Sequence, residues 1–434
     1  MNFSWESGAR SYSRNIPNVF TRADGYYVYD DKGDEYLDFL CGAGTLLLGH
    51  NHPAIRRAIE GVTEPFMNSL DLRTSSEEAF VNTLLPVLPF KNKQDVRVHF
   101  CGPAGGDSVE AALKLAAIKT GRKGIFAFHG SYHGMSQGAL SVTSSCKARA
   151  AGLSVQRDVT FLPFPYPYRF PSPYNTEDAA TDFCLSHLKL LLEDDHSGTA
   201  LPGAIIVEPV QGEGGTIPAP KRFLQELRKL CDTYGIVLIF DEIQAGLGRC
   251  GAWFCANLYD VQPDIVTISK GIGGGFPMAL IAFHKDLDVW KPGDHIGTFR
   301  GQQYAMAAGR ALLQTIQDEN LPDNAAKQGE YLVSALNDMQ QRYPDMIGEI
   351  RGRGLYIGVE VSKDTADPGV LSGKIQQAML ARHIIMERGG RQSSVLRVLG
   401  PLTMTKDISD VFLNKLEDSL ADVKRQNLVY KSAA

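Results

Sequence analysis

Short apolar runs alternate with amphipathic segments between about residues 95 and 285. Segments 107–120 and 220–234 carry apolar residues at helical spacing, and Gly235 follows the second, where a C-terminal cap belongs. Strand-like apolar runs cover 96–100, 124–129, 204–207, 236–240, 265–269 and 278–283. Strand, helix, strand at this spacing predicts βαβ units, an α/β fold and a mostly parallel sheet.

The pattern changes after about residue 325. Two helical stretches, 325–343 and 370–383, flank a strand-like run at 354–361 and lead to a second at 395–398. This order predicts a smaller α+β domain, and a hairpin-like segment at 25–40 is expected to pack against it. The expected division is an N-terminal segment at 1–65, a large domain at 66–324 and a small domain at 325–434.

Composition and charge narrow the possible classes. The 434 residues include 44 Lys and Arg against 49 Asp and Glu, a net charge of −5 without the basic excess typical of nucleic-acid binding. No apolar run approaches the roughly 18 residues that span a membrane, and the N-terminus lacks the apolar stretch of a signal peptide. We expect a cytoplasmic globular protein with neither nucleic-acid nor membrane partners.

Cysteine and histidine usage predicts no metal site. The seven cysteines are an odd number without a CxxC pair, which argues against a disulfide framework and a structural zinc site. Cys250 and Cys255 could ligate a metal, but no second pair stands nearby in the sequence. His50 and His52 precede a proline in a predicted loop and are interpreted as structural.

Ionisable residues follow three of the predicted strands. Glu208 comes after 204–207, Asp241 and Glu242 come after 236–240, and Lys270 comes after 265–269. Ligands of open α/β sheets bind at the carboxyl ends of strands. Each residue alone could be an ordinary solvated lysine or helix cap. Their combination with a glycine-rich run at 271–275 favours a site.

A phosphate-binding feature accompanies these strand ends. The small-residue loop 101–106 opens onto the helix predicted at 107–120, and backbone N–H groups at such a helix start favour an anion. Pyridoxal phosphate matches the set: its aldehyde needs the amine of Lys270, and its pyridine nitrogen needs the carboxylate of Asp241. Tyr132 could supply an aromatic face for the ring.

Two other motifs are typical of different enzyme classes. Residues 236–242 resemble a Walker B strand, but the nearest P-loop candidate, 369–375, is one residue short and lacks the final hydroxyl. Residues 246–251 spell G-x-G-x-x-G, a pattern of nicotinamide dehydrogenases. They do not lead directly from a strand into a helix, so a loop is favoured.

Many ordered motifs together resemble the class III aminotransferases, which are fold type I enzymes with pyridoxal phosphate. The matching segments are FLCGAGTLLLGHNHP, GGDSVEAALKLA, SYHGMSQGAL, VEPVQGEGG, IFDEIQAGLGRCG, PDIVTISKGIGGG, GTFRGQQ and RGRGLYIGVEV. The resemblance implies a large domain with a seven-stranded sheet, a smaller α+β domain, and a homodimer or dimer of dimers. Within the family the chain is most similar to the diaminobutyrate–2-oxoglutarate group.

The resemblance assigns cofactor roles to matched positions. Lys270 would form the imine and shuttle the proton, and Asp241 would pair with the pyridine nitrogen. Gln244 would contact the ring hydroxyl, with Glu208 near it, and Tyr132 would stack on the ring.

Other matched positions concern the phosphate and the substrates. Gly105 and Gly106 would bind the phosphate through their N–H groups, and Thr298 would reach the phosphate of the partner subunit. Arg397 would hold a substrate carboxylate, and Glu213 would mask that arginine when the amino donor is bound.

The reaction implied is ping-pong transamination between L-2,4-diaminobutyrate and 2-oxoglutarate, giving L-aspartate 4-semialdehyde and L-glutamate. The runner-up is a relative that uses ornithine, acetylornithine or 4-aminobutyrate. Met135 stands where ornithine-type enzymes carry an arginine, which weakens the ornithine alternative. A non-catalytic α/β binding protein is the alternative from another class, and a yellow purified protein would dismiss it.

Overall fold

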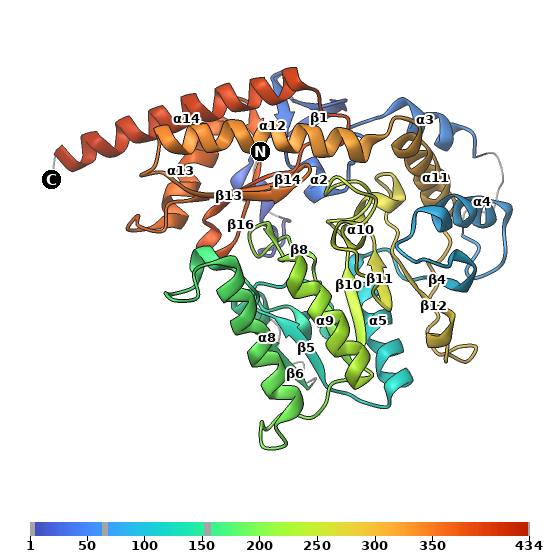
Figure 1. Ribbon diagram of the computed structural model, residues 1–434. Helices are drawn as coiled ribbons and strands as arrows, with labels where there is room; N and C mark the ends of the chain where they lie inside the picture. Colours follow the sequence, from blue (N-terminus) through green and yellow to red (C-terminus); the bar gives the residue numbers. More distant parts are fainter. Residues whose placement is uncertain (1–4, 63–67, 152–157, 433–434) are drawn as a thin grey trace.

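The computed structural model describes residues 5–62, 68–151 and 158–432 (Figure 1). Its centre is a seven-stranded sheet with strand order β4-β12-β11-β10-β7-β5-β6. The strands are β4 (Val96–Phe100), β5 (Ile125–Phe128), β6 (Val159–Leu162), β7 (Ala204–Val207), β10 (Val237–Asp241), β11 (Ile265–Ile268) and β12 (Leu280–His284). All pairings are parallel except those of β12, which runs antiparallel to both neighbours. The predicted mostly parallel sheet of seven strands is confirmed.

Both faces of this sheet are buried, which explains its continuous apolar strands. In β10, Val237 and Ile239 pack in the core formed with α5 (Gly105–Thr120). Leu238 and Phe240 alternate with them and belong to the core on the other face, with residues of α8 (Glu177–Glu193) and α9 (Lys221–Tyr234). Gly235 ends α9 in the left-handed conformation at φ 58°, as its position after the apolar pattern predicted.

The C-terminal part forms a second, antiparallel sheet of order β13-β14-β17-β16. Its strands are β13 (Ile347–Arg353), β14 (Tyr356–Val361), β16 (Glu387–Gly389) and β17 (Val395–Val398). The accompanying helices are α12 (Leu321–Arg342), α13 (Pro368–Leu380) and α14 (Lys406–Ser432), at the top and upper left of Figure 1. The two helices and two strands expected in this region are present; β13, β16 and α14 were not anticipated.

The N-terminal segment joins the C-terminal part through a third sheet of order β1-β2-β3-β15. Its strands are β1 (Phe20–Asp24), β2 (Tyr27–Asp30), β3 (Glu35–Asp38) and β15 (Ile384–Ile385). The pair β3 and β15 is parallel, with Leu37 opposite Ile384. This contact supports the expected packing of the N-terminal segment against the small domain.

The other α-helices and strands complete the described part of the chain. They are α1 (Tyr12–Asn15), α2 (Cys41–Gly44), α3 (Pro53–Glu60), α4 (Ser75–Leu84), α6 (Gln137–Val142), α7 (Cys146–Ala151), β8 (Val210–Gln211), β9 (Ile217–Pro218), α10 (Cys255–Tyr259) and α11 (Gln303–Asp318). Of these, β8 and β9 pair as a small antiparallel sheet. Within the described ranges, no helix has the length and apolar character needed to cross a bilayer.

Candidate active site

A cavity of about 980 Å³ lies at the carboxyl ends of the central strands. Eight of the ten site residues predicted from the sequence line it: Gly105, Gly106, Tyr132, Glu208, Glu213, Asp241, Gln244 and Lys270. Arg397 lies directly behind two of these side chains, and Thr298 is not among the lining residues. The cavity therefore gathers groups that are up to 165 positions apart in the sequence, counted from Gly105 to Lys270.

Lys270 begins a short 3₁₀ turn after β11, in a left-handed backbone conformation with φ 49°. Burial of the Lys270 amine lowers its pKa, and the nearby Arg397 guanidinium lowers it further. The carboxylates of Glu213 and Asp241 act in the opposite direction but do not outweigh the burial. A lowered pKa favours the neutral amine, which is the nucleophilic form.

Asp241 is the last residue of β10 and is almost fully buried. Its Oδ2 lies 2.7 Å from Nδ1 of His133, and its Oδ1 accepts the N–H of Ile243 at 3.1 Å. The His133 backbone N–H donates in turn to the Thr143 hydroxyl at 2.9 Å. These contacts fix the carboxylate in one orientation at the floor of the cavity.

His133 is a residue that the sequence interpretation missed. It stands next to Tyr132 in the segment Gly130–Gly134, where only the tyrosine was given a role. The one available signal was this adjacency, because the partner Asp241 lies 108 positions further along the chain.

Glu208 holds two chain segments in place beside the cavity. Its Oε1 accepts the N–H of Tyr132 and its Oε2 accepts the N–H of Gly212, both at 2.9 Å. Burial, with a contribution from the Asp241 carboxylate, raises the pKa of Glu208 to about 7. Glu208 thereby positions the Tyr132 segment against the cavity.

Glu242 does not belong to the site, contrary to the expectation that it would join the other strand-end groups. Its carboxylate accepts the N–H groups of Cys255 at 2.9 Å and Ala256 at 2.8 Å at the start of α10. Successive side chains of a strand point to opposite faces, so Asp241 and Glu242 cannot both face the cavity. Glu242 is instead a buried helix cap.

The start of α5 forms a close-fitting cradle of backbone. A Cβ added to Gly134 would lie 2.9 Å from the Cα of Gly106, and one added to Gly105 would lie 3.1 Å from Cδ1 of Ile243. The Ala104 N–H is already used by the Asp107 carboxylate at 2.9 Å. Gly105 and Gly106, the first residues of α5, line the cavity, so the N–H groups of the first helical turn lie next to it with the positive end of the helix dipole, an arrangement that suits a phosphate.

Arg397 is fully buried in β17 and contacts four side chains. Its Nη1 lies 2.7 Å from Oε1 of Glu213 and 2.7 Å from Oε2 of Glu387. Its Nη2 donates to the Gln244 amide oxygen and, at 3.4 Å, to the Tyr356 hydroxyl. Burial lowers the pKa of Arg397, but the two carboxylates outweigh it and the net direction is upward.

Gln244 links this arginine to the N-terminal segment. Its amide nitrogen donates to the Ala43 carbonyl at 2.7 Å, and its oxygen accepts from the Tyr356 hydroxyl at 2.6 Å as well as from Arg397. The predicted contact of Gln244 with the cofactor ring stays a prediction. The Glu387 contact with Arg397 was not anticipated.

Thr298 is exposed, in the segment between β12 and α11. Two large apolar neighbours are also exposed, Ile296 at 72 % and Phe299 at 65 %. The hydroxyl of Ser69 donates to the Gly301 carbonyl at 3.1 Å and ties this region to the chain around residue 69. The position of Thr298 is compatible with the predicted reach into a partner subunit.

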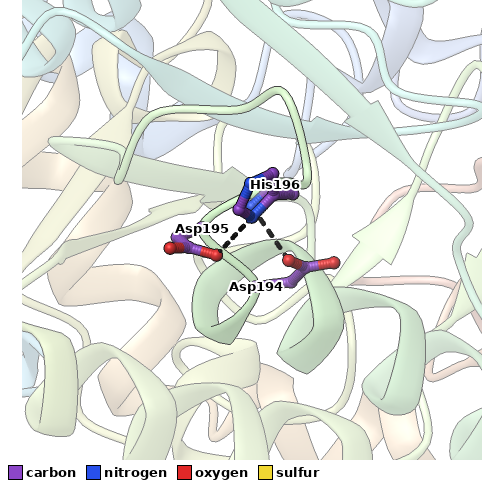
Figure 2. A group of neighbouring side chains, drawn as sticks. All are labelled: Asp194, Asp195 and His196. Atoms are coloured by element: carbon purple, nitrogen blue, oxygen red, sulfur yellow. Dashed lines mark hydrogen bonds and ion pairs between the residues drawn. The ribbon is translucent and has the colours of Figure 1, made fainter.

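One group of side chains in the described part of the chain is close enough to hold an ion: Asp194, Asp195 and His196 (Figure 2). The three residues are consecutive and exposed, in the turn after α8. His196 Nδ1 lies 2.6 Å from Asp195 Oδ1, and the backbone N–H of His196 donates to Asp194 Oδ1 at 2.9 Å. Solvated turns of this composition are common, and we assign no metal to it.

Comparison with known proteins gives full-length matches. The class-III aminotransferase family matches residues 9–420. A diaminobutyrate–2-oxoglutarate aminotransferase of Haemophilus influenzae is 41% identical over 428 residues, 96% of this chain and 93% of the relative. An enzyme of the same name from Rhizobium meliloti is 42% identical over 427 residues, 96% of this chain and 90% of the relative.

Solved structures agree with these matches. A pyridoxal-phosphate-bound amine transaminase from an uncultivated Pseudomonas species superimposes with TM-score 0.87 at 27% identity, over 98% of this chain and 99% of the other. An (S)-enantioselective ω-transaminase from Thermomicrobium roseum gives TM-score 0.86 at 27% identity, over 97% and 96% of the two chains. The chain belongs to the class III aminotransferases and is a pyridoxal-phosphate-dependent aminotransferase of fold type I.

Proposed function

We propose that the enzyme interconverts L-2,4-diaminobutyrate and 2-oxoglutarate with L-aspartate 4-semialdehyde and L-glutamate. The observation that carries the substrate pair is the full-length similarity, at 36–42% identity, to relatives named for it. The Arg397–Glu213 pair at the cavity supports it, because this reaction requires one pocket to accept a glutamate carboxylate in only one half-reaction.

The residues of the cavity suit pyridoxal 5′-phosphate, because Gly105 and Gly106 line it at the start of α5 and offer the backbone N–H groups of a helix N-terminus to a phosphate. When bound, the cofactor supplies a carbonyl carbon for the amino group and an electron-accepting ring. Gly105 and Gly106 would hold the phosphate through backbone N–H groups, and Asp241 would hold a proton at the ring nitrogen. Tyr132 would stack on the ring, with Glu208 fixing the Tyr132 backbone.

Lys270 has two tasks in this proposal. Its Nζ would hold the cofactor between turnovers, and the free amine would accept and return the proton at the reacting carbon of the substrate. The lowered pKa supports both tasks, because a neutral amine can accept a proton. The turn at 270–273 fixes the Lys270 backbone, and Lys270 and Asp241 line the same cavity.

Substrate selection rests on Arg397. Glutamate presents its α-amine, so its α-carboxylate lies next to the reacting carbon and pairs with Arg397. Diaminobutyrate presents its terminal amine and has no carboxylate at that place, so Glu213 occupies Arg397 instead. Glu213 is 40 % exposed at its side chain whereas Arg397 is fully buried, which supports a glutamate that can leave and return.

We also propose a homodimer in which Thr298 completes the partner's phosphate site. Exposed Ile296 and Phe299 beside Thr298 support an interface at this loop, because large apolar side chains gather where a partner covers them. The division at residues 1–65, 66–324 and 325–434 remains our proposal for the domains. All seven cysteines are free, which supports a reducing cytoplasmic location.

Steady-state assays with a donor panel test the substrate assignment. The purified holoenzyme receives 2-oxoglutarate and either diaminobutyrate, ornithine, acetylornithine or 4-aminobutyrate, and glutamate formation is measured. We expect the largest kcat/KM with diaminobutyrate. A larger kcat/KM with one of the other donors would replace the proposed substrate while leaving the aminotransferase assignment intact.

A further inference from the structure

Arg397 has a second carboxylate partner, Glu387, besides Glu213, which leaves and returns in the proposed function. Glu387 and Arg397 lie directly opposite each other on β16 and β17. Glu387 Oε2 and Glu213 Oε1 both lie 2.7 Å from the same Nη1 of Arg397. Two carboxylates therefore share one guanidinium nitrogen.

The two carboxylates differ in how firmly they are held. The Glu387 side chain is 9 % exposed and sits on a strand, whereas the Glu213 side chain is 40 % exposed, in the loop between β8 and β9. The second oxygen of Glu387, Oε1, accepts the hydroxyl of Tyr12 at 2.7 Å. Glu387 is thus fixed by its strand, by Arg397 and by the N-terminal segment.

A count of charges separates their tasks. With Glu213 in place, the group of Arg397, Glu213 and Glu387 carries a net charge of −1. When Glu213 leaves, Arg397 and Glu387 remain and are neutral together, and an arriving substrate carboxylate restores −1. Without Glu387, the departure of Glu213 would leave a buried guanidinium with no anionic partner, which is strongly unfavourable.

We propose that Glu387 is a specificity-determining positioning residue, a permanent counter-ion that lets Glu213 release Arg397 so that the same pocket accepts glutamate. Tyr12 assists by holding Glu387 while Glu213 moves. This inference rests on the proposed function, because it concerns the exchange between the two substrates. Glu387 acts through Arg397 and has no assigned contact with the reacting atoms.

Single-turnover kinetics of the holoenzyme test this role, with the cofactor absorbance followed separately for each half-reaction. In Glu387→Gln we expect the glutamate half-reaction to slow by about tenfold or more, because Glu213 can no longer leave Arg397 without exposing a buried charge. The diaminobutyrate half-reaction, in which Glu213 stays in place, should change by less than about threefold. Equal losses in both half-reactions would overturn the proposal.

A second variant protects the test against misfolding of Glu387→Gln. Tyr12→Phe keeps every charge and removes one hydrogen bond to Glu387, and we expect a loss of about threefold confined to the glutamate half-reaction. If the glutamate and diaminobutyrate half-reactions of Tyr12→Phe are both unchanged, or both slowed equally, the proposal is overturned even where Glu387→Gln cannot be purified.

The chain offers a matched control in another hydrogen-bonded tyrosine and glutamate. The Tyr29 hydroxyl donates to Glu35 Oε2 at 2.8 Å on the exposed surface. Glu35→Gln and Tyr29→Phe should leave both half-reactions unchanged. A wild-type enzyme that reacts with glutamate but not with diaminobutyrate would refute the proposed substrate instead, so the two failures are distinguishable.

Discussion

Replacement of Glu213 by alanine tests how one pocket serves two substrates. The change removes the exposed carboxylate on Nη1 of Arg397 and leaves Glu387, Gln244 and the Tyr356 hydroxyl in contact with the guanidinium. Because Glu387 remains, the buried charge stays compensated and the fold should lose no more than about 2 kcal/mol. Glu387 thus spares the variant the high cost of a buried guanidinium without an anionic partner.

The functional effect of Glu213→Ala follows from the freed guanidinium. A hydrogen bond between charged groups contributes about 1.5–3 kcal/mol, and the 40 % exposure of Glu213 reduces this to ~1–2 kcal/mol. That range corresponds to about a fivefold to thirtyfold loss in the diaminobutyrate half-reaction. The α-carboxylate of diaminobutyrate can then bind Arg397 and present the α-amine to the cofactor, which would yield 4-amino-2-oxobutyrate.

Two measurements decide this prediction. Single-turnover rates compare the diaminobutyrate and glutamate half-reactions of Glu213→Ala, and mass spectrometry of the products detects attack at the α-amine. The expected result is a selective loss with diaminobutyrate and a new α-keto product. Equal rate losses with no such product would mean that Glu213 only braces its loop.

Three further predictions concern the rest of the site. His133→Ala should weaken cofactor affinity by about tenfold, measured by absorbance titration, since Asp241 loses a charge-assisted partner at 2.7 Å; an unchanged affinity would remove His133 from the site. Mixed Lys270→Ala and Thr298→Val subunits should regain some activity on subunit exchange, since heterodimers contain one native site, and no recovery would refute the shared site. The raised pKa of about 7 for Glu208, against 4.5 ordinarily, means that the folded state binds the extra proton. Relative to Glu208→Gln, the unfolding free energy of the wild type should therefore fall by up to ~3 kcal/mol as pH rises from about 4.5 to 7. Parallel curves of unfolding free energy against pH for the two proteins would contradict this prediction.

Local patterns predicted most of the central elements. The run at 204–207 coincides with β7, and the amphipathic segment 220–234 coincides with α9 to within one residue. Apolar periodicity and a glycine cap depend only on residues that are close in the sequence, so they predict a helix or strand directly. The antiparallel direction of β12 was not predictable in this way, because strand direction depends on where the chain returns to the sheet.

The candidate site shows the same limit. The motifs around Lys270 and Asp241 identified groups that the structure places around one cavity. The sequence did not predict three contacts, because each joins side chains that approach only after folding. They are His133 with Asp241, Glu387 with Arg397, and Tyr12 with Glu387. Tyr12 and Glu387 are 375 positions apart, and no periodicity connects them.

The proposed chemistry depends most directly on Lys270, and activity of Lys270→Ala measures that dependence. Glutamate formation from diaminobutyrate and 2-oxoglutarate is assayed without added amines, and thermal unfolding of the variant checks that the fold is intact. We predict no detectable turnover in a folded protein, because no other amine lines the described cavity beside Asp241. A folded Lys270→Ala variant that keeps a large fraction of wild-type activity would contradict the assignment of the site.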